Sequence, residues 1–524
     1  MRKTFMIKKK AYTILLSVST ICMLTLIIWW GYTNLNQQEV NADIDLYALV
    51  PSDCEAILES KDISTLQKNI HSAHFTQQNH SLHVSNLLSN FFTYLDKVSR
   101  EQAHGLSPEM SSQFLVSFHN PNTPQDQVIY GRLGKDDIHL ITNLINNHTN
   151  SKSSPKKLIY KEETITIYSF GKEFLACYFK PGFFAISLQE KLIEKVIDAY
   201  KGEQSIKEDK SFNTLRNKSK HNELLSLYFR SDKANNSWNE YEIRMNSGAI
   251  YLTGGYTESN TSTLLTDRLI KHTSLERIDD TDLPSHVQMM YQIPFAPKTD
   301  TLSSTINYNF LENILTSNDC KEIDLIMFSP KEANNTTHQL LTMPFLENQI
   351  EDIKSKLRTS NHIVRKQSLW IQGIPYPIWQ CNADTTILSY FIHQPKETTY
   401  FLSIYENRLL LSNQKETLLH YIKEVIDHNP TNANTNKFLY TYCLNDLAEN
   451  ANFTFVADMN DIINHRSSST TSAPLLPNFF LKHKDFFKHF MLSTQLIYTD
   501  GQINSQIILT YQGDSLAFKQ AMNY

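Results

Sequence analysis

The sequence predicts an α+β fold of two homologous halves, each a mainly antiparallel sheet with amphipathic helices on one face, behind one N-terminal transmembrane helix. The first observation is internal repetition. Residues 168–212 predict strand, turn, strand and helix, and a shift of about 226 residues repeats this pattern and pairs Glu190 with Glu416. The second observation is an uncharged N-terminal segment, and the third is a strand–strand–helix order found in both halves.

Composition limits the function classes. The chain has 524 residues, 41% hydrophobic and 20% charged, so it can bury the cores of two or three domains and is not of the disordered class. The net charge of −5 offers no basic surplus for a nucleic-acid surface. The 13 glycines leave few loops that could cradle a phosphate. None of the six cysteines forms a CxxC pair, which favours buried thiols over a disulfide framework.

The N-terminal segment predicts a single membrane anchor. Residues 1–10 form a basic tail, Ala11–Tyr32 is uncharged and long enough to span a bilayer, and residues 33–45 form a polar tether. Basic residues precede the span and acidic residues follow it, so we expect the N-terminus in the cytoplasm and everything after Tyr32 on the outside. A cleaved signal is the alternative, but no small-x-small site follows the span, and Ile21 precedes Cys22 where a lipoprotein signal needs a small residue.

Each half is expected to open at a proline and to continue with strands and helices. The first half, residues 46–275, opens at Val50–Pro51, and the second half, residues 276–524, opens at Leu283–Pro284. In the first half the patterns predict a helix at 84–98, strands at 113–119 and 127–133, and a helix at 136–146. In the second half they predict strands at 323–328 and 338–343 and a helix at 346–357.

The repeated stretch adds a hairpin and a helix to each half. Strands at 157–160 and 164–169 flank a Glu162–Glu163 turn and lead into the first hairpin. Ser187 and Glu190 predict a capping box at the start of the helix that follows. The closing strands are expected at 223–230, 249–257, 452–458, 491–499 and 502–511.

One loop holds four histidines in two HxxH spacings. They are His71, His74, His80 and His83. Imidazole binds Zn²⁺ and Ni²⁺, and two such pairs could close a tetrahedral metal site. The alternative is a solvated histidine-rich loop, because no carboxylate that could orient the ligands lies nearby in the sequence.

Aromatic residues of the first repeated stretch could line a ligand groove. They are Tyr168, Phe174, Tyr178 and Phe183. The alternative is that these rings form core between the sheet and the helix, which is the more common role of aromatic residues on strands.

No motif assigns a catalytic residue or a cofactor. The GxSxG nucleophile elbow, the GxxxxGK[ST] and GxGxxG phosphate loops and the HExxH metal motif are absent from the sequence. The carboxylate pairs Glu162–Glu163 and Asp279–Asp280 lie in polar loops, where burial rarely perturbs a pKa, so solvated turns explain them better than acid–base catalysis. A triad of scattered serine, histidine and aspartate residues stays open.

Several short motifs occur together along the chain. They are the lysine-rich N-terminus, the single span, the Val50–Pro51–x–Asp53 opening, and strands that end at Ser187 and Ser412 before an amphipathic helix. In this combination the chain resembles a family of bacterial membrane-anchored envelope proteins with a duplicated α+β ectodomain, a domain of unknown function. The resemblance implies a single-pass protein of the bacterial inner membrane with an exported, duplicated ectodomain in the periplasm, and it transfers no catalytic residue.

These observations predict a non-enzymatic, membrane-anchored envelope protein that binds or scaffolds another envelope component. The expected partners are the membrane, through Ala11–Tyr32, and an envelope protein, with no nucleic acid and no cofactor. Two alternatives stay open: a periplasmic lipid- or peptide-binding module, and a hydrolase without a recognisable motif. An apolar pocket would favour the first, and a buried histidine beside a serine or a carboxylate would favour the second.

Overall fold

The computed structural model describes most of the chain after residue 43. The described residues are 44–62, 113–120, 125–134, 154–170, 173–218, 224–232, 237–255, 274–284, 287–295, 310–330, 337–382, 399–426, 443–465, 487–499 and 502–512, with single positions within 66–73 and 137–145. The predicted basic tail and the predicted span Ala11–Tyr32 lie outside them. Within the described residues, no helix is both long and apolar enough to cross a membrane. The chain divides into two compact units, Met1–Gln67 with Ser85–Thr214, and Lys68–Val84 with Leu215–Tyr524.

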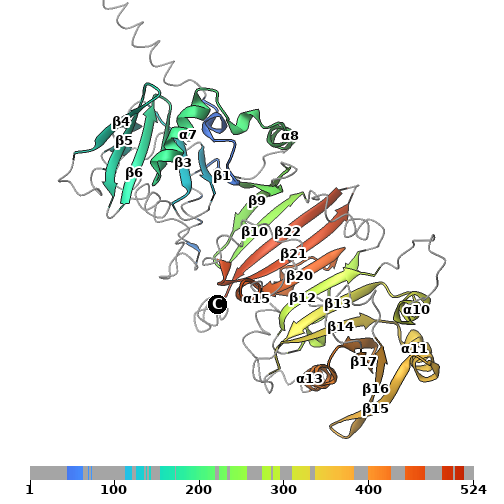
Figure 1. Ribbon diagram of the computed structural model, residues 1–524. Helices are drawn as coiled ribbons and strands as arrows, with labels where there is room; N and C mark the ends of the chain where they lie inside the picture. The colour runs from blue at the N-terminus through green and yellow to red at the C-terminus, as the bar shows by residue number, and fades with distance from the viewer. Residues whose placement is uncertain are drawn as a thin grey trace, which may run out of the picture. The chain divides into compact units, whose positions relative to one another are not determined.

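Unit 1 is an antiparallel sheet covered by one long helix. Its described strands are β1 (Ala56–Ser60), β2 (Phe114–Phe118), β3 (Gln127–Arg132), β4 (Lys156–Tyr160), β5 (Glu163–Phe170), β6 (Glu173–Lys180) and β7 (Phe183–Ser187). They pair in the order β1-β2-β3-β7-β6-β5-β4. Helix α7 (Glu190–Tyr200) contacts β3, β6 and β7, as Figure 1 shows. Its N-cap is Gln189 without a side-chain cap, so the capping box predicted from Ser187 and Glu190 does not form.

Short elements at either end of unit 1 pack together. The 3-10 helix η1 (Leu46–Leu49) contacts α7 and the 3-10 helix η2 (Ile206–Glu208). Phe212, on α8 (Lys210–Lys218), is fully buried, and its ring lies 5.4 Å from the ring of Tyr47. The aromatic residue after α7 therefore fixes the chain against the start of the unit.

Unit 2 is a longer antiparallel sheet. Its described strands are β8 (Leu225–Asp232), β9 (Ser237–Met245), β10 (Ala249–Gly255), β12 (Val287–Pro294), β13 (Glu322–Phe328), β14 (His338–Pro344), β15 (Ile363–Ile371), β16 (Ile374–Asn382), β17 (Thr399–Tyr405), β18 (Arg408–Ser412), β20 (Phe453–Asp458), β21 (Phe490–Thr499) and β22 (Gln502–Tyr511). They pair in the order β8-β9-β10-β22-β21-β20-β12-β13-β14-β18-β17-β16-β15. A separate pair joins β11 (Leu275–Glu276) to β19 (Asn450–Ala451).

Helices cover part of this second sheet. They are η3 (Asp280–Asp282), α10 (Phe310–Ser317), α11 (Glu347–Thr359), α13 (Lys415–Ile426) and α15 (Met459–His465). Helix α13 packs against β14, β15, β17 and β18. Its buried residues Leu418 and Ile422 join Ile326 and Leu340 of the strands in one apolar core. Burying each such side chain stabilises the fold by roughly 1.5–3 kcal/mol.

The predicted α+β class of two homologous halves was wrong, because the described residues form mainly antiparallel sheet. The predicted transmembrane helix lies outside the described residues. Strand β10 belongs to the predicted first half, yet it pairs with β22 of the predicted second half, from Ala249 opposite Thr510 to Gly255 opposite Asn504. The error has a physical reason, because the period-2 pattern of a strand shows which face is buried but not which distant strand is its partner.

Strand order nevertheless repeats within the molecule. Strands β12–β18 of unit 2 pair in the same sequence as β1–β7 of unit 1. Ser187 and Ser412 each donate a hydrogen bond to a glutamine carbonyl on the neighbouring strand, at 2.8 and 2.9 Å, so these two serines are equivalent. Helices α7 and α13 both begin three residues later, which pairs Glu190 with Lys415 and not with Glu416.

Candidate functional site

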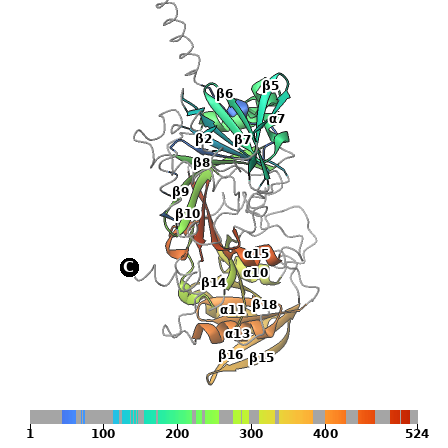
Figure 2. The ribbon, with the colours of Figure 1, turned by 90° about the vertical axis from the view of Figure 1, so that its left-hand side faces the viewer.

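The β15–β16 hairpin is the candidate binding element of unit 2. Gln372 and Gly373 form its turn with φ of 48° and 82°, and a two-residue turn with both φ positive matches the right-handed twist of the strands. Glycine accepts this φ without strain. The strands pair Trp370 with Pro375 and Ile371 with Ile374 beside the turn. Figure 2 shows the hairpin extending past α13.

One face of this hairpin is held in the core while its tip is open to solvent. Ile371 and Ile378 are buried in the apolar core, and Leu369 and Tyr376 pack against it. The opposite face carries Trp370, which is 68% exposed, and Ile374 at the tip is 53% exposed. Exposed apolar side chains that gather in one place, as Trp370 and Ile374 do at this tip, indicate an interaction surface more strongly than a single one does.

Basic residues are frequent on α11 and at the start of β15, the strand that leads to the hairpin turn. Between Ile353 and Ala383 the sequence contains no acidic residue and five basic ones, although the whole chain has a net charge of −5. They are Lys354, Lys356, Arg358, Arg365 and Lys366. Lys354 and Lys356 pair with Glu351 and Asp352 on α11, at 2.6 and 2.5 Å. Arg358, Arg365 and Lys366 are exposed, and the ammonium of Lys366 donates to the carbonyl of Arg358.

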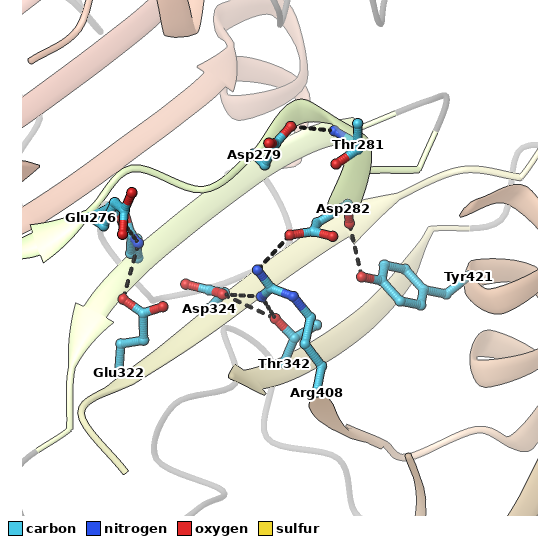
Figure 3. Close-up of polar contacts among 10 residues, drawn as sticks. Glu276, Asp279, Thr281, Asp282, Glu322, Asp324, Thr342, Arg408 and Tyr421 are labelled. Atoms are coloured by element: carbon cyan, nitrogen blue, oxygen red, sulfur yellow. Dashed lines mark hydrogen bonds and ion pairs between the residues drawn. The ribbon is translucent and has the colours of Figure 1, made fainter. Parts of the chain in front are cut away.

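A charged cluster lies inside the same unit, at the start of β18. Arg408 reaches between two carboxylates: its Nη1 donates to Asp324 Oδ2 at 3.0 Å and its Nη2 donates to Asp282 Oδ2 at 2.7 Å (Figure 3). The Thr342 hydroxyl donates to Asp324 Oδ2 at 3.0 Å, and the Tyr421 hydroxyl donates to the Asp282 carbonyl at 2.8 Å. The cluster therefore joins η3, β13, β14, β18 and α13.

Burial dominates the electrostatics of this cluster. Asp324 is fully buried, which raises its pKa, and the neighbouring Arg408 opposes that rise. Glu322 lies two residues earlier on β13, and burial together with the charge of Asp324 raises its pKa to about 8. Gln292 donates to Glu322 Oε2 at 3.1 Å. Within the described residues, Asp324 Oδ1 has no hydrogen-bond partner. Asp324 is buried within the sheet, where its hydrogen bonds with Thr342 and Arg408 join β13 to β14 and β18.

Unit 1 contains a linear serine–histidine–aspartate array. His119 Nε2 lies 2.8 Å from Ser117 Oγ, and His119 Nδ1 lies 3.3 Å from Asp53 Oδ1. The contact with His119 and the ion pair with Lys195 hold the pKa of Asp53 below its ordinary value. The order matches a hydrolase triad. Ser117 and His119 are buried, however, and the Ser117 hydroxyl lies 2.9 Å from the hydroxyl of Tyr130, whereas Asp53 at the other end of the array is 52% exposed. The serine is therefore enclosed in the core.

The four histidines predicted as a metal site, His71, His74, His80 and His83, lie outside the described residues. Within the part of the chain that is described, no group of three or more His, Cys, Asp or Glu side chains could hold a metal ion. All five cysteines in that part are buried, as the sequence predicts.

The four predicted groove aromatics do not line one groove. Tyr178 and Phe183 are fully buried, with ring centroids 5.7 Å apart. Tyr168 is also buried but pairs with Leu175, which puts it on the opposite face of the sheet from Tyr178. Phe174 is 66% exposed. Three of these rings are therefore core, as the alternative interpretation of the sequence had it.

Sequence reasoning missed both the hairpin tip and the Arg408 cluster. Asp324 had a signal, because it is a charged residue inside the apolar strand EIDLIMF, where a partner of opposite charge is required. The partner itself lies far along the chain and has no sequence signal. The exposure of Trp370 had no signal in the sequence, since apolar residues occur on both sides of the Gln372–Gly373 turn and only the fold decides which face is covered.

Comparisons with known proteins are sparse. No protein-family model and no curated protein matches the chain. Among solved structures the chain is similar to two crystal forms of TP0453. Form IV shares 11% identity over 41% of this chain and 82% of that chain, with a TM-score of 0.24. Form III shares 8% identity over 71% of this chain and 94% of that chain, with a TM-score of 0.21. At these scores the similarity assigns neither a family nor a function.

Proposed function

We propose that the protein is a non-enzymatic binding or scaffolding component of the bacterial cell envelope, and that the β15–β16 hairpin is its docking element. The observation that carries this proposal is the exposed Trp370 on a hairpin whose other face is fixed in the core. Keeping a large apolar side chain in water costs free energy, and a partner that covers it recovers that cost.

The polar groups of the molecule support a structural role. Arg408 and its carboxylates join strands to η3 and α13, and Ser117 is closed off by Tyr130 and His119. Catalytic groups need access to a substrate, whereas Ser117, His119 and Asp324 are buried. The orientation in a membrane rests on the charge asymmetry around Ala11–Tyr32, a segment outside the described residues, and the envelope location rests on the resemblance of the short motifs.

Site-specific photo-crosslinking in intact cells tests the docking element. Benzoylphenylalanine is placed at position 370 of the full-length chain, and at position 159 as a matched control. Ile159 is 76% exposed and also stands two residues before a turn with positive φ, in the β4–β5 hairpin. We expect a discrete crosslinked product, protein or lipid, from position 370 alone. Identical products from both positions, or none from position 370, would overturn the assignment.

A further inference from the structure

We infer that the component bound by the β15–β16 hairpin is a bilayer surface that contains anionic phospholipids, and that the hairpin enters the headgroup region tip first. This inference rests on the proposed function in taking the hairpin as the docking element. It goes further by naming the chemistry of the partner, which is lipid and not protein.

The tip has the side chains that an interfacial wedge requires. Trp370 and Pro375 are paired across the strands, and Ile374 follows the turn, all three exposed. Tryptophan favours the membrane–water interface because its indole is largely apolar but keeps a polar N–H. The turn itself, Gln372–Gly373, carries no charge that would have to be desolvated.

Charge complementarity selects an anionic surface. The segment Ile353–Ala383 has five basic residues and no acidic one. Arg358, Arg365 and Lys366 are exposed, so they can reach lipid phosphates. Each basic residue held near an anionic leaflet adds to binding, and the effect decays within a Debye length. Lys354 and Lys356 pair with Glu351 and Asp352, so Arg358, Arg365 and Lys366 supply the positive charge of this segment.

The spacing along the strand fits a bilayer interface. Lys366 and Trp370 are four residues apart on the same face of β15, a separation of about 13 Å. Arg365 is on the opposite face at nearly the same height, beside Gln380. An apolar tip buried about 5–10 Å therefore leaves basic side chains on both faces at the level of the phosphates.

The β4–β5 hairpin of unit 1 provides an internal control. Its Ile159 is as exposed as Trp370, but its turn carries Lys161 and Glu162, and Glu163 follows. Lys161 is neutralised by Asp198 and Glu203, at 2.8 and 2.7 Å. This hairpin also carries exposed Lys156 and Lys157, but acidic Glu162 and Glu163 lie at its tip, where the β15–β16 hairpin has no charge. We therefore expect it to stay in water.

An environment-sensitive residue on the full-length chain tests the inference. Dansylalanine replaces Trp370 in one protein and Ile159 in another, and each is reconstituted into vesicles of phosphatidylcholine alone or with 30% phosphatidylglycerol. We expect a blue shift and quenching by doxyl-labelled lipid at position 370 only, and only with phosphatidylglycerol. Arg365→Glu with Lys366→Glu should abolish the shift at 30% phosphatidylglycerol. Lys156→Glu with Lys157→Glu should have no effect.

Other occupants give different outcomes. A shift at position 370 that grows with protein concentration and needs no vesicles would assign the tip to a second copy of the chain and overturn the inference. An unshifted probe at position 370 would overturn it as well. If position 370 still crosslinks a protein in cells in that case, the docking function stands and only its lipid partner is wrong. If it does not, both proposals fall.

Discussion

Three equivalent core positions carry Leu, Tyr and Phe in unit 1 and Asp, Thr and Arg in unit 2. The shared strand order and the equivalence of Ser187 with Ser412 align β2, β3 and β7 with β13, β14 and β18. The aligned residues are Leu115 and Asp324, Tyr130 and Thr342, and Phe183 and Arg408. Unit 1 thus fills with side chains of the hydrophobic class a place where unit 2 buries an ion pair.

This difference between the units indicates the structural role of the Arg408–Asp324 ion pair. Taking two charges out of water costs several kcal/mol each, and well-packed apolar residues often serve stability equally well or better. Apolar packing holds η1 in unit 1, where the rings of Tyr47 and Phe212 pack at a tilt of 47°. In unit 2, Arg408 and Tyr421 instead fix η3 through hydrogen bonds of defined direction. We infer that the ion pair of unit 2 serves to fix the position of η3, whereas the apolar packing of unit 1 serves stability.

Removing one partner of the buried ion pair in unit 2 should have the largest effect on the free energy of unfolding. Arg408→Ala leaves the carboxylate of Asp324 buried without its counter-charge, which we expect to cost about 3–5 kcal/mol of unfolding free energy. Urea denaturation followed by circular dichroism measures it. The exposed Arg365→Ala is the control and should change stability by less than about 0.5 kcal/mol.

Replacing both partners with the residues of unit 1 should restore much of that loss. The variant Arg408→Phe with Asp324→Leu removes both buried charges and leaves Asp282, whose side chain is 26% exposed, to be solvated. We expect its unfolding free energy to lie within about 2 kcal/mol of the native chain. A double variant as unstable as Arg408→Ala would show that the pair is a net stabiliser and that the two units are not interchangeable at this place.

The pH dependence of unit 2 sharpens the comparison. Folded Glu322 keeps its proton up to a pKa of about 8, whereas the unfolded carboxyl loses it near its ordinary value of 4.5. The native state therefore binds more protons between these values, and the unfolding free energy falls as pH rises from 5 to 8, by at most about 1.4 kcal/mol per pH unit. Glu322→Gln should flatten this slope in urea titrations at several pH values. The same slope after the substitution would assign the pH dependence to another group.

The elements were easier to predict than their partners. The predicted strands at 113–119 and 127–133 correspond to β2 and β3, and the predicted helix at 346–357 corresponds to α11. Local periodicity carries these, because it needs only neighbouring residues. The pairing of β10 with β22 and the contact of Arg408 with Asp324 join residues far apart in the chain. Nothing in the local pattern encodes such contacts, so the sheet and the cluster emerge only from the fold.

A close contact gives the smallest and most specific prediction. Gly131 of β3 faces Phe184 of β7, and a Cβ added at this glycine would lie 2.4 Å from the Phe184 ring. In unit 2 the same pair is Met343 with Leu409, where a longer side chain stands opposite a smaller one. Gly131→Ala should therefore cost about 1–3 kcal/mol through overpacking. Adding Phe184→Leu should relieve this overpacking, because the ring that would clash with the new methyl group is removed. Thermal unfolding measures the stability of both variants. A double variant less stable than Gly131→Ala alone would mean that the loss of the buried Phe184 ring costs more than the clash.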